Sequence, residues 1–170
     1  MITDRPADVE DRAVPGHWEG DLILGSVASR SSIGTLVERS SRLVLLFPLG
    51  TDRTAENTRL KLTETVRTLP AQMRRSITWD QGKEMAYHAR FTIDTGLQVY
   101  FCDPHAPWER GTNENTNGLL REYFPKGTDL SQVTQATCDA VAAQLNNRPR
   151  KVLGFRTPLE SWTQLLATTA

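Results

Sequence analysis

Three β-rich segments follow one another near the start of this chain, and strand and helix patterns alternate after them. The strand candidates cover residues 17–24, 33–38 and 42–47, and only a short polar turn separates the last two. This arrangement predicts an antiparallel meander as the first half of a sheet.

The alternation that follows predicts further elements. Residues 54–69 are expected to form a helix, because Leu62, Val66 and Leu69 recur at helical spacing and Pro70 ends the pattern. Strands are expected at 76–79 and 97–102, with a helix over 84–95 between them. Three helices should complete the chain: from Thr112 to about Phe124, over 131–146, and from a capping box at Thr157. The order βββαβαβααα predicts an α/β fold.

The size and composition are those of one globular domain. A chain of 170 residues with 38% hydrophobic residues can bury a sizeable core, and no apolar run approaches the roughly 20 residues of a membrane span. No secretory signal is recognisable, and Cys102 and Cys138 lack metal or redox spacing, which favours a reducing, intracellular compartment. We expect a polar leader over residues 1–15, a single domain over 16–170, and no membrane partner.

The charge balance leaves the partner open. The chain has 20 basic and 20 acidic residues, whereas a nucleic-acid partner usually brings a basic excess. A carboxylate-rich catalytic centre can nevertheless offset basic DNA-contacting surfaces, and a separate binding domain can supply affinity.

Three carboxylates occupy positions typical of functional groups. Asp21 lies within an apolar strand, where a carboxylate costs free energy unless it is paired or binds a cation. Asp80 ends a strand just before Gly82, and open α/β sheets commonly present functional groups there. Glu114 falls in the first turn of a helix after a proline-containing loop. Three carboxylates on three elements can converge at one edge of a sheet.

Such a group suits magnesium, which prefers oxygen ligands and needs few protein carboxylates beside substrate phosphates. Two metal ions can activate an attacking oxygen and stabilise the leaving one in a phosphoryl displacement. The structural alternatives are a paired buried charge at Asp21, a turn residue at Asp80, and at Glu114 a helix-dipole interaction of about 0.3–1 kcal/mol. The combination favours the metal site.

Two sequence blocks carry a family resemblance. Residues 16–23 (GHWEGDLI) and 108–115 (WERGTNEN) resemble the hallmark blocks of insertion sequence 30 family transposases. Between Asp80 and Glu114 lie 33 residues (114 − 80 − 1), the spacing of the DDE pattern in this family and in retroviral-integrase-like enzymes. The similarity continues through 117–127, 147–149 and 157–158, and it covers nearly all of 9–162.

The resemblance implies an RNase H-like fold, with a mixed five-stranded sheet flanked by helices. It places Asp21, Asp80 and Glu114 as the catalytic residues and ligands of two Mg²⁺ or Mn²⁺ ions. The implied activity is metal-dependent cleavage and strand transfer of DNA at insertion-element ends. The implied partners are terminal-repeat and target DNA, bound by a homo-oligomer assembled on DNA in the bacterial cytoplasm. Family members carry a helix-turn-helix region ahead of this core, and the residues before Asp21 are too few for one.

Other side chains are weaker candidates for DNA binding. Arg121 shares a helix face with Glu114 and resembles the basic residue that follows the catalytic glutamate by seven positions. Each of the others has a structural alternative in packing, capping or solvation: Trp108, Asn113, Asn117, Lys126 and the basic run at 148–151. Two rival functions remain open: a nuclease of the same fold that never joins strands, and a non-catalytic DNA-binding or assembly module.

Overall fold

A mixed five-stranded sheet forms the centre of the molecule in this computed structural model, which describes residues 14–79, 88–102 and 111–169, with only the backbone of 111–114. The strand order is β3-β2-β1-β4-β5. The first three strands are antiparallel neighbours, while β1 pairs with β4, and β4 with β5, in parallel. The bounds are β1 His17–Leu24, β2 Ser32–Glu38, β3 Val44–Gly50, β4 Ser76–Trp79 and β5 Gln98–Phe101. The predicted meander and mixed sheet are confirmed.

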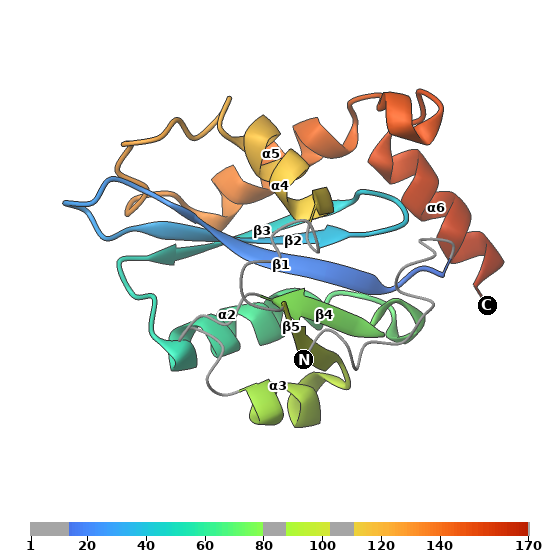
Figure 1. The fold of residues 1–170 in the computed structure, drawn as a ribbon, viewed down its shortest axis with the longest axis horizontal. Helices are drawn as coiled ribbons and strands as arrows, with labels where there is room; N and C mark the ends of the chain where they lie inside the picture. The colour runs from blue at the N-terminus through green and yellow to red at the C-terminus, as the bar shows by residue number, and fades with distance from the viewer. Residues whose placement is uncertain (1–13, 80–87, 103–110, 170) are drawn as a thin grey trace.

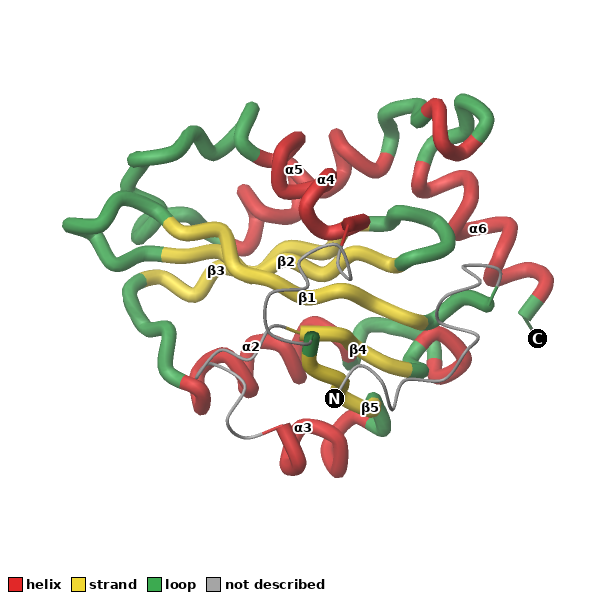
Figure 2. Tube along the Cα trace, in the orientation of Figure 1, coloured by secondary structure: helices red, strands yellow, loops and turns green. Residues whose placement is uncertain are grey.

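Helices cover both faces of this sheet (Figures 1 and 2). The helices α2 and α3 lie on one side, and α4 and α5 on the other. The helix bounds are α2 Ala55–Val66, α3 His88–Thr95, α4 Gly111–Leu120, α5 Gln135–Asn146 and α6 Pro158–Thr168, with short 3-10 helices η2 Ala71–Met73 and η5 Lys151–Leu153. The observed order matches the predicted βββαβαβααα. None of the helices in the described ranges is long and apolar enough to cross a membrane.

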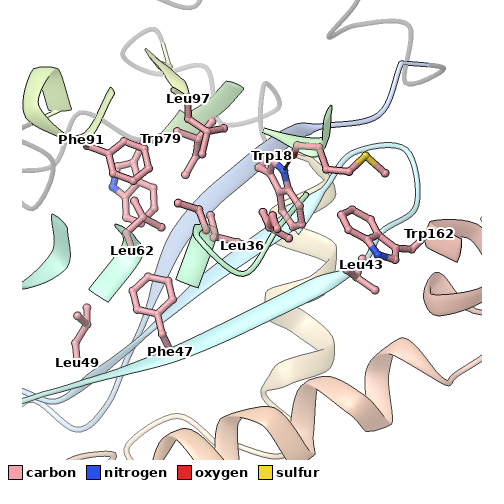
Figure 3. Close-up of a cluster of buried hydrophobic side chains, with 14 residues drawn as sticks. Trp18, Leu36, Leu43, Phe47, Leu49, Leu62, Trp79, Phe91, Leu97 and Trp162 are labelled. Carbon is pink, nitrogen blue, oxygen red and sulfur yellow. Dashed lines mark hydrogen bonds between the residues drawn. The ribbon is translucent and has the colours of Figure 1, made fainter. Parts of the chain in front are cut away.

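Each face of the sheet has its own hydrophobic core, because side chains alternate between the two faces along a strand. Trp18 of β1 packs in the first core with residues of α2 and α3, including Leu62 and Phe91 (Figure 3). Ile23 of β1 packs in the second core with α4 and α5, including Leu120. Asp21 lies two residues before Ile23, so its side chain is on the same face of β1, the face that α4 covers.

Several strand and helix boundaries differ from prediction for local reasons. The third strand begins at Val44 rather than at residue 42, because Arg42 has φ 66° in the left-handed region. It continues through Pro48, which is tolerated because β3 is an edge strand. The predicted helix over 131–146 begins only at Gln135, where the Thr134 hydroxyl accepts the Thr137 backbone N–H at 3.1 Å.

The helix predicted to reach Phe124 ends at Leu120. Beyond it the backbone tightens, with the N–H of Tyr123 donating to the carbonyl of Leu120 at 3.0 Å, and Pro125 stops continuation. The helix predicted over 84–95 is described only from His88. The helix predicted over 54–69 is shorter, Ala55–Val66, with Thr54 as its cap.

The capping box of α6 is confirmed. The Thr157 hydroxyl accepts the Glu160 N–H, and a Glu160 carboxylate oxygen accepts the Thr157 N–H, both at 3.0 Å. Pro158 occupies the first turn, where its missing N–H costs nothing. Hydrogen bonds from the Thr157 backbone and then its side chain hold the pKa of Glu160 below its ordinary value.

Candidate active site

Asp21 is a half-buried carboxylate in the second half of β1, and both of its oxygens accept hydrogen bonds. Its Oδ1 accepts the backbone N–H of Leu22 at 2.8 Å, and its Oδ2 accepts from the Nδ2 of Asn117 at 3.1 Å. The strand backbone is fixed from the other side, because Thr35 of β2 donates its hydroxyl to the Asp21 carbonyl at 3.3 Å. The orientation of this carboxylate is therefore determined jointly by β1 and α4.

One face of α4 and of the turn after it lies along β1. One turn after Asn117, the Arg121 guanidinium donates to the carbonyl oxygens of Leu24 at 3.2 Å and of Phe124 at 3.3 Å. Position 114 lies in α4 three residues before Asn117, and residues three apart share a helix face. The helix that contains Glu114 is thus docked with this face toward the strand that carries Asp21.

A hollow of about 330 Å³ opens beside Asp21. Leu22, Leu24 and Arg53 line it together with the carboxylate. Arg53 is exposed in the loop between β3 and α2, so it brings a positive charge to the same hollow. A carboxylate and a guanidinium around an open space suit a ligand that combines a metal cation with phosphate groups.

A close contact between Gly20 of β1 and Trp79 of β4 lies next to this site. Gly20 precedes Asp21, and a Cβ atom there would lie 2.1 Å from the Cε3 and Cζ3 atoms of Trp79. The Trp79 ring therefore occupies the space over Gly20, and Trp79 is the last residue of β4. Only glycine leaves room for the Trp79 ring in this place.

The polar residues before Asp21 on the same face of β1 have structural contacts. Glu19 and Arg39 are both almost inaccessible and form an ion pair at 3.0 Å. His17 shares a hydrogen bond of 2.7 Å with the Ser76 hydroxyl of β4, in agreement with a structural role. These contacts stabilise the beginning of β1 and its pairing with neighbouring strands.

Residues 11–107, more than half of the chain, match the profile of the integrase core domain. The chain belongs to the integrase core domain family. The resemblance to insertion sequence 30 family transposases is confirmed as well, because relatives with 53–54% identity cover most of this integrase core.

Two curated bacterial transposases are similar to nearly the whole of this chain. The transposase for insertion sequence element IS1086 of Cupriavidus metallidurans is 54% identical over 96% of this chain and 48% of its own length. Transposase InsI for insertion sequence element IS30C of Escherichia coli is 53% identical over 94% of this chain and 41% of its own length. The integrase core spans about half the length of the curated relatives it matches.

Solved structures confirm the RNase H-like fold. The catalytic core domain of BIV integrase superposes with a TM-score of 0.65 at 17% identity, covering 90% of this chain and 97% of that one. A chain of the simian T-cell lymphotropic virus intasome, solved in complex with PP2A regulatory subunit B56 gamma, gives a TM-score of 0.67 at 18% identity over 86% and 54% of the two chains. These likenesses establish the fold of the integrase core.

The predicted site residues fall into three groups. Asp80 and Trp108 lie outside the described residues, and Asn113 and Glu114 are described only as backbone within α4. Asn117 contacts Asp21, whereas Arg121 donates to backbone carbonyls and Lys126 is exposed in the turn after α4. Among the side chains that the structure describes, no three His, Cys, Asp or Glu residues form a metal-binding group.

Arg53 was not predicted from the sequence. It is one of 20 basic residues, and its loop has no motif that distinguishes it. Only the tertiary arrangement of β1 and the β3–α2 loop brings it to the hollow beside Asp21.

Proposed function

We propose that this integrase core is the catalytic domain of a DNA transposase that cleaves the ends of an insertion element and joins them to target DNA. The observation that carries the proposal is the Asp21 carboxylate, oriented by Asn117 of α4 and facing a hollow that also contains Arg53. The names of the curated relatives, transposases for insertion sequence elements, support the same function.

The strand register supports Asp80 as the partner of Asp21. Paired residues of β1 and β4 differ by 59 in number, as in His17 with Ser76 (76 − 17). The same offset carried on to Asp21 leads to position 80 (21 + 59), directly after Trp79. On the other side of β1, the docking of α4 supports Glu114 as the third member.

We propose that Asp21, Asp80 and Glu114 hold two Mg²⁺ or Mn²⁺ ions. The described part of the site fits this group, because the oriented Asp21 carboxylate offers hard oxygen ligands beside a hollow. When bound, two such ions activate an attacking oxygen and stabilise a leaving one during phosphoryl transfer. Asn117 keeps the Asp21 carboxylate in a fixed orientation, and Arg53 contributes positive charge for a DNA phosphate.

The remaining assignments follow from this function. The substrates are the terminal repeats of the element and target DNA, and the active form is a homo-oligomer assembled on DNA. Residues 16–170 form the catalytic core, residues 1–15 a leader, and the site of action is the bacterial cytoplasm. We propose that Arg121, Lys126, Asn113 and Trp108 contact the DNA.

The substitution Asp21→Asn tests the proposal. It should abolish metal-dependent cleavage and joining of labelled element ends, measured with the core joined to its end-binding region. The matched control is Asp139→Asn, which removes an exposed carboxylate from α5 and should leave both reactions unchanged. Full activity of Asp21→Asn would refute the metal site, and cleavage without joined products would identify a nuclease.

Thermal melting gives a second readout. Two carboxylates about 4 Å apart at an effective dielectric near 20 repel by roughly 4 kcal/mol, whereas a hydrogen bond such as that from Asn117 contributes about 1 kcal/mol. Asp21→Asn should therefore melt at or above the wild type in chelator. Added Mg²⁺ should raise the melting temperature of the wild type more, because ligand binding stabilises the folded state.

A further inference from the structure

The connection between α5 and α6 is a closed loop built around η5. The Arg150 N–H donates to the Arg156 carbonyl at 3.0 Å, and the Phe155 N–H donates to the Arg150 carbonyl at 2.8 Å. Inside the loop, the N–H of Gly154 bonds the Lys151 carbonyl at 3.0 Å. These bonds hold the side chains of the connector, residues 148–156, in a defined arrangement.

The connector concentrates positive charge in a chain whose net charge is zero. It contains Arg148, Arg150, Lys151 and Arg156, and the sequence has no acidic residue from 140 to 159. Within the described part of the chain, neither Arg150 nor Lys151 has an ion-pair partner, although Arg150 is half-buried. Burial, and then the charge of Arg148, lowers the pKa of Arg150 below its ordinary value. A bound anion would relieve this accumulation of like charge.

Arg148 has a different role, because it ties the connector to the segment after α4. Its Nη2 donates to the Glu122 carboxylate at 3.2 Å and to the Tyr123 hydroxyl at 2.9 Å. The connector is therefore attached on the side of the sheet that α4 and α5 cover (Figure 1). Asp21 faces the same side.

Two apolar side chains project from the connector beside these cations. Phe155 is 70% exposed and Val152 is 61% exposed. Phe155 also has φ 67°, a conformation that costs free energy for any residue other than glycine. A large aromatic ring held outward at a strained position makes no contribution to the core, and its surface is free to contact a ligand beside the cations.

We propose that the connector binds the backbone of duplex DNA, with Arg150 and Lys151 contacting phosphates and Phe155 packing against the adjacent sugar or base surface. Cations that contact phosphates position DNA without reading its sequence, and apolar side chains commonly accompany them at DNA surfaces. The inference rests on the proposed function, and it adds a second contact region, separate from the hollow at Asp21, to the same bound DNA.

The salt dependence of DNA binding tests this assignment. Each phosphate contact contributes about 0.9 to the slope of log affinity against log salt concentration. The double variant Arg150→Ala/Lys151→Ala should lower the magnitude of that slope by roughly two, measured by fluorescence anisotropy with the whole chain and a duplex. Phe155→Ala should weaken binding by about fivefold or more while leaving the slope unchanged.

The control is Arg67→Ala/Arg90→Ala, which removes two exposed cations from the opposite layer, at the end of α2 and in α3. An unchanged slope in the connector variant, or an equal change in the control, would overturn the proposal. Metal-dependent cleavage, measured with the core joined to its end-binding region, reports separately on the function: a joined protein that binds duplex but never cleaves it would refute the catalytic proposal alone. A wild-type chain without salt-dependent duplex binding would refute the connector assignment.

Discussion

Asn117 joins α4 to the strand that carries the candidate catalytic carboxylate. A carboxylate that is free to rotate about its last torsion does not present its oxygens in one direction, whereas the bonds from Asn117 and from the Leu22 N–H define that direction. Such outer contacts commonly determine how well a ligand holds its metal. We therefore regard Asn117 as a positioning residue for Asp21.

The substitution Asn117→Ala should raise the Mg²⁺ concentration needed for half-maximal cleavage by about 10- to 100-fold, because Asp21 loses its orienting donor. Activity at saturating metal should recover in part. Asn115→Ala is the control, since Asn115 is exposed on the same helix. An equal metal requirement for the two variants would show that Asn117 only supports packing.

At the level of single residues, the sequence is informative where the local environment is unusual. Asp21 stood out as a candidate because three apolar residues follow it in a strand, and its role as a metal ligand stays a prediction. Arg53 could not be recognised, because an exposed cation in a loop has no local peculiarity. The contact from Asn117 could likewise not be predicted from the sequence, since it joins residues 96 positions apart.

Among the elements, side chains of α5 protect the exposed edge of β3 from pairing with another strand. The side-chain amide of Asn146 accepts the Val44 N–H at 2.9 Å and donates to the Val44 carbonyl at 3.0 Å, as a neighbouring strand would. Gln135 donates to the Leu46 carbonyl at 2.9 Å, and Pro48 has no N–H to offer. These features limit pairing with a further strand.

We predict that Asn146→Ala destabilises the protein by about 1–3 kcal/mol, because both Val44 backbone groups lose their partner. The groove of about 520 Å³ beside them admits water, which favours the lower end of this range. Denaturant unfolding measures the loss, and light scattering should detect concentration-dependent association through β3. Asn147→Ala, at the exposed neighbouring position, should do neither; identical behaviour of the two would contradict this role.

Element boundaries show where local signals suffice. The strand at 17–24 and the cap at Thr157 were predicted correctly, because alternation and capping chemistry act within a few residues. The third strand was misplaced, since a left-handed Arg42 and an edge position for Pro48 depend on neighbours in space. The early end of α4 was missed because the backbone already tightens after Leu120, where the Tyr123 N–H donates to the Leu120 carbonyl.

For the whole molecule, the second core provides a reporter of global unfolding. Cys138 of α5 is fully buried there. Burial, followed by the nearby charge of Asp139, raises the pKa of the Cys138 thiol to about 12. Because the unfolded thiol ionises near pH 8.5, stability linked to this group is fully present below that pH and is lost as the pH rises toward 12.

In a Cys102→Ala background, we predict that iodoacetamide labels Cys138 at pH 8 at least 100-fold more slowly in native conditions than in denaturant, because only thiolate exposed by unfolding reacts. Mass spectrometry of the alkylated chain measures the rate. The labelling rate should rise in parallel with the unfolded fraction as denaturant is added. Rapid labelling of the native protein would mean that the second core opens locally.

The contact between Gly20 and Trp79 has a consequence for how this molecule can vary. The position of the indole ring depends on one missing methyl group, since any side chain at position 20 would overlap it. A side chain at position 20 would displace the buried Trp79 ring from its place over β1, directly beside the candidate metal ligand Asp21. A carbon atom added at a position that has no chemical role would thus disturb the support of the candidate site without touching any of its functional groups.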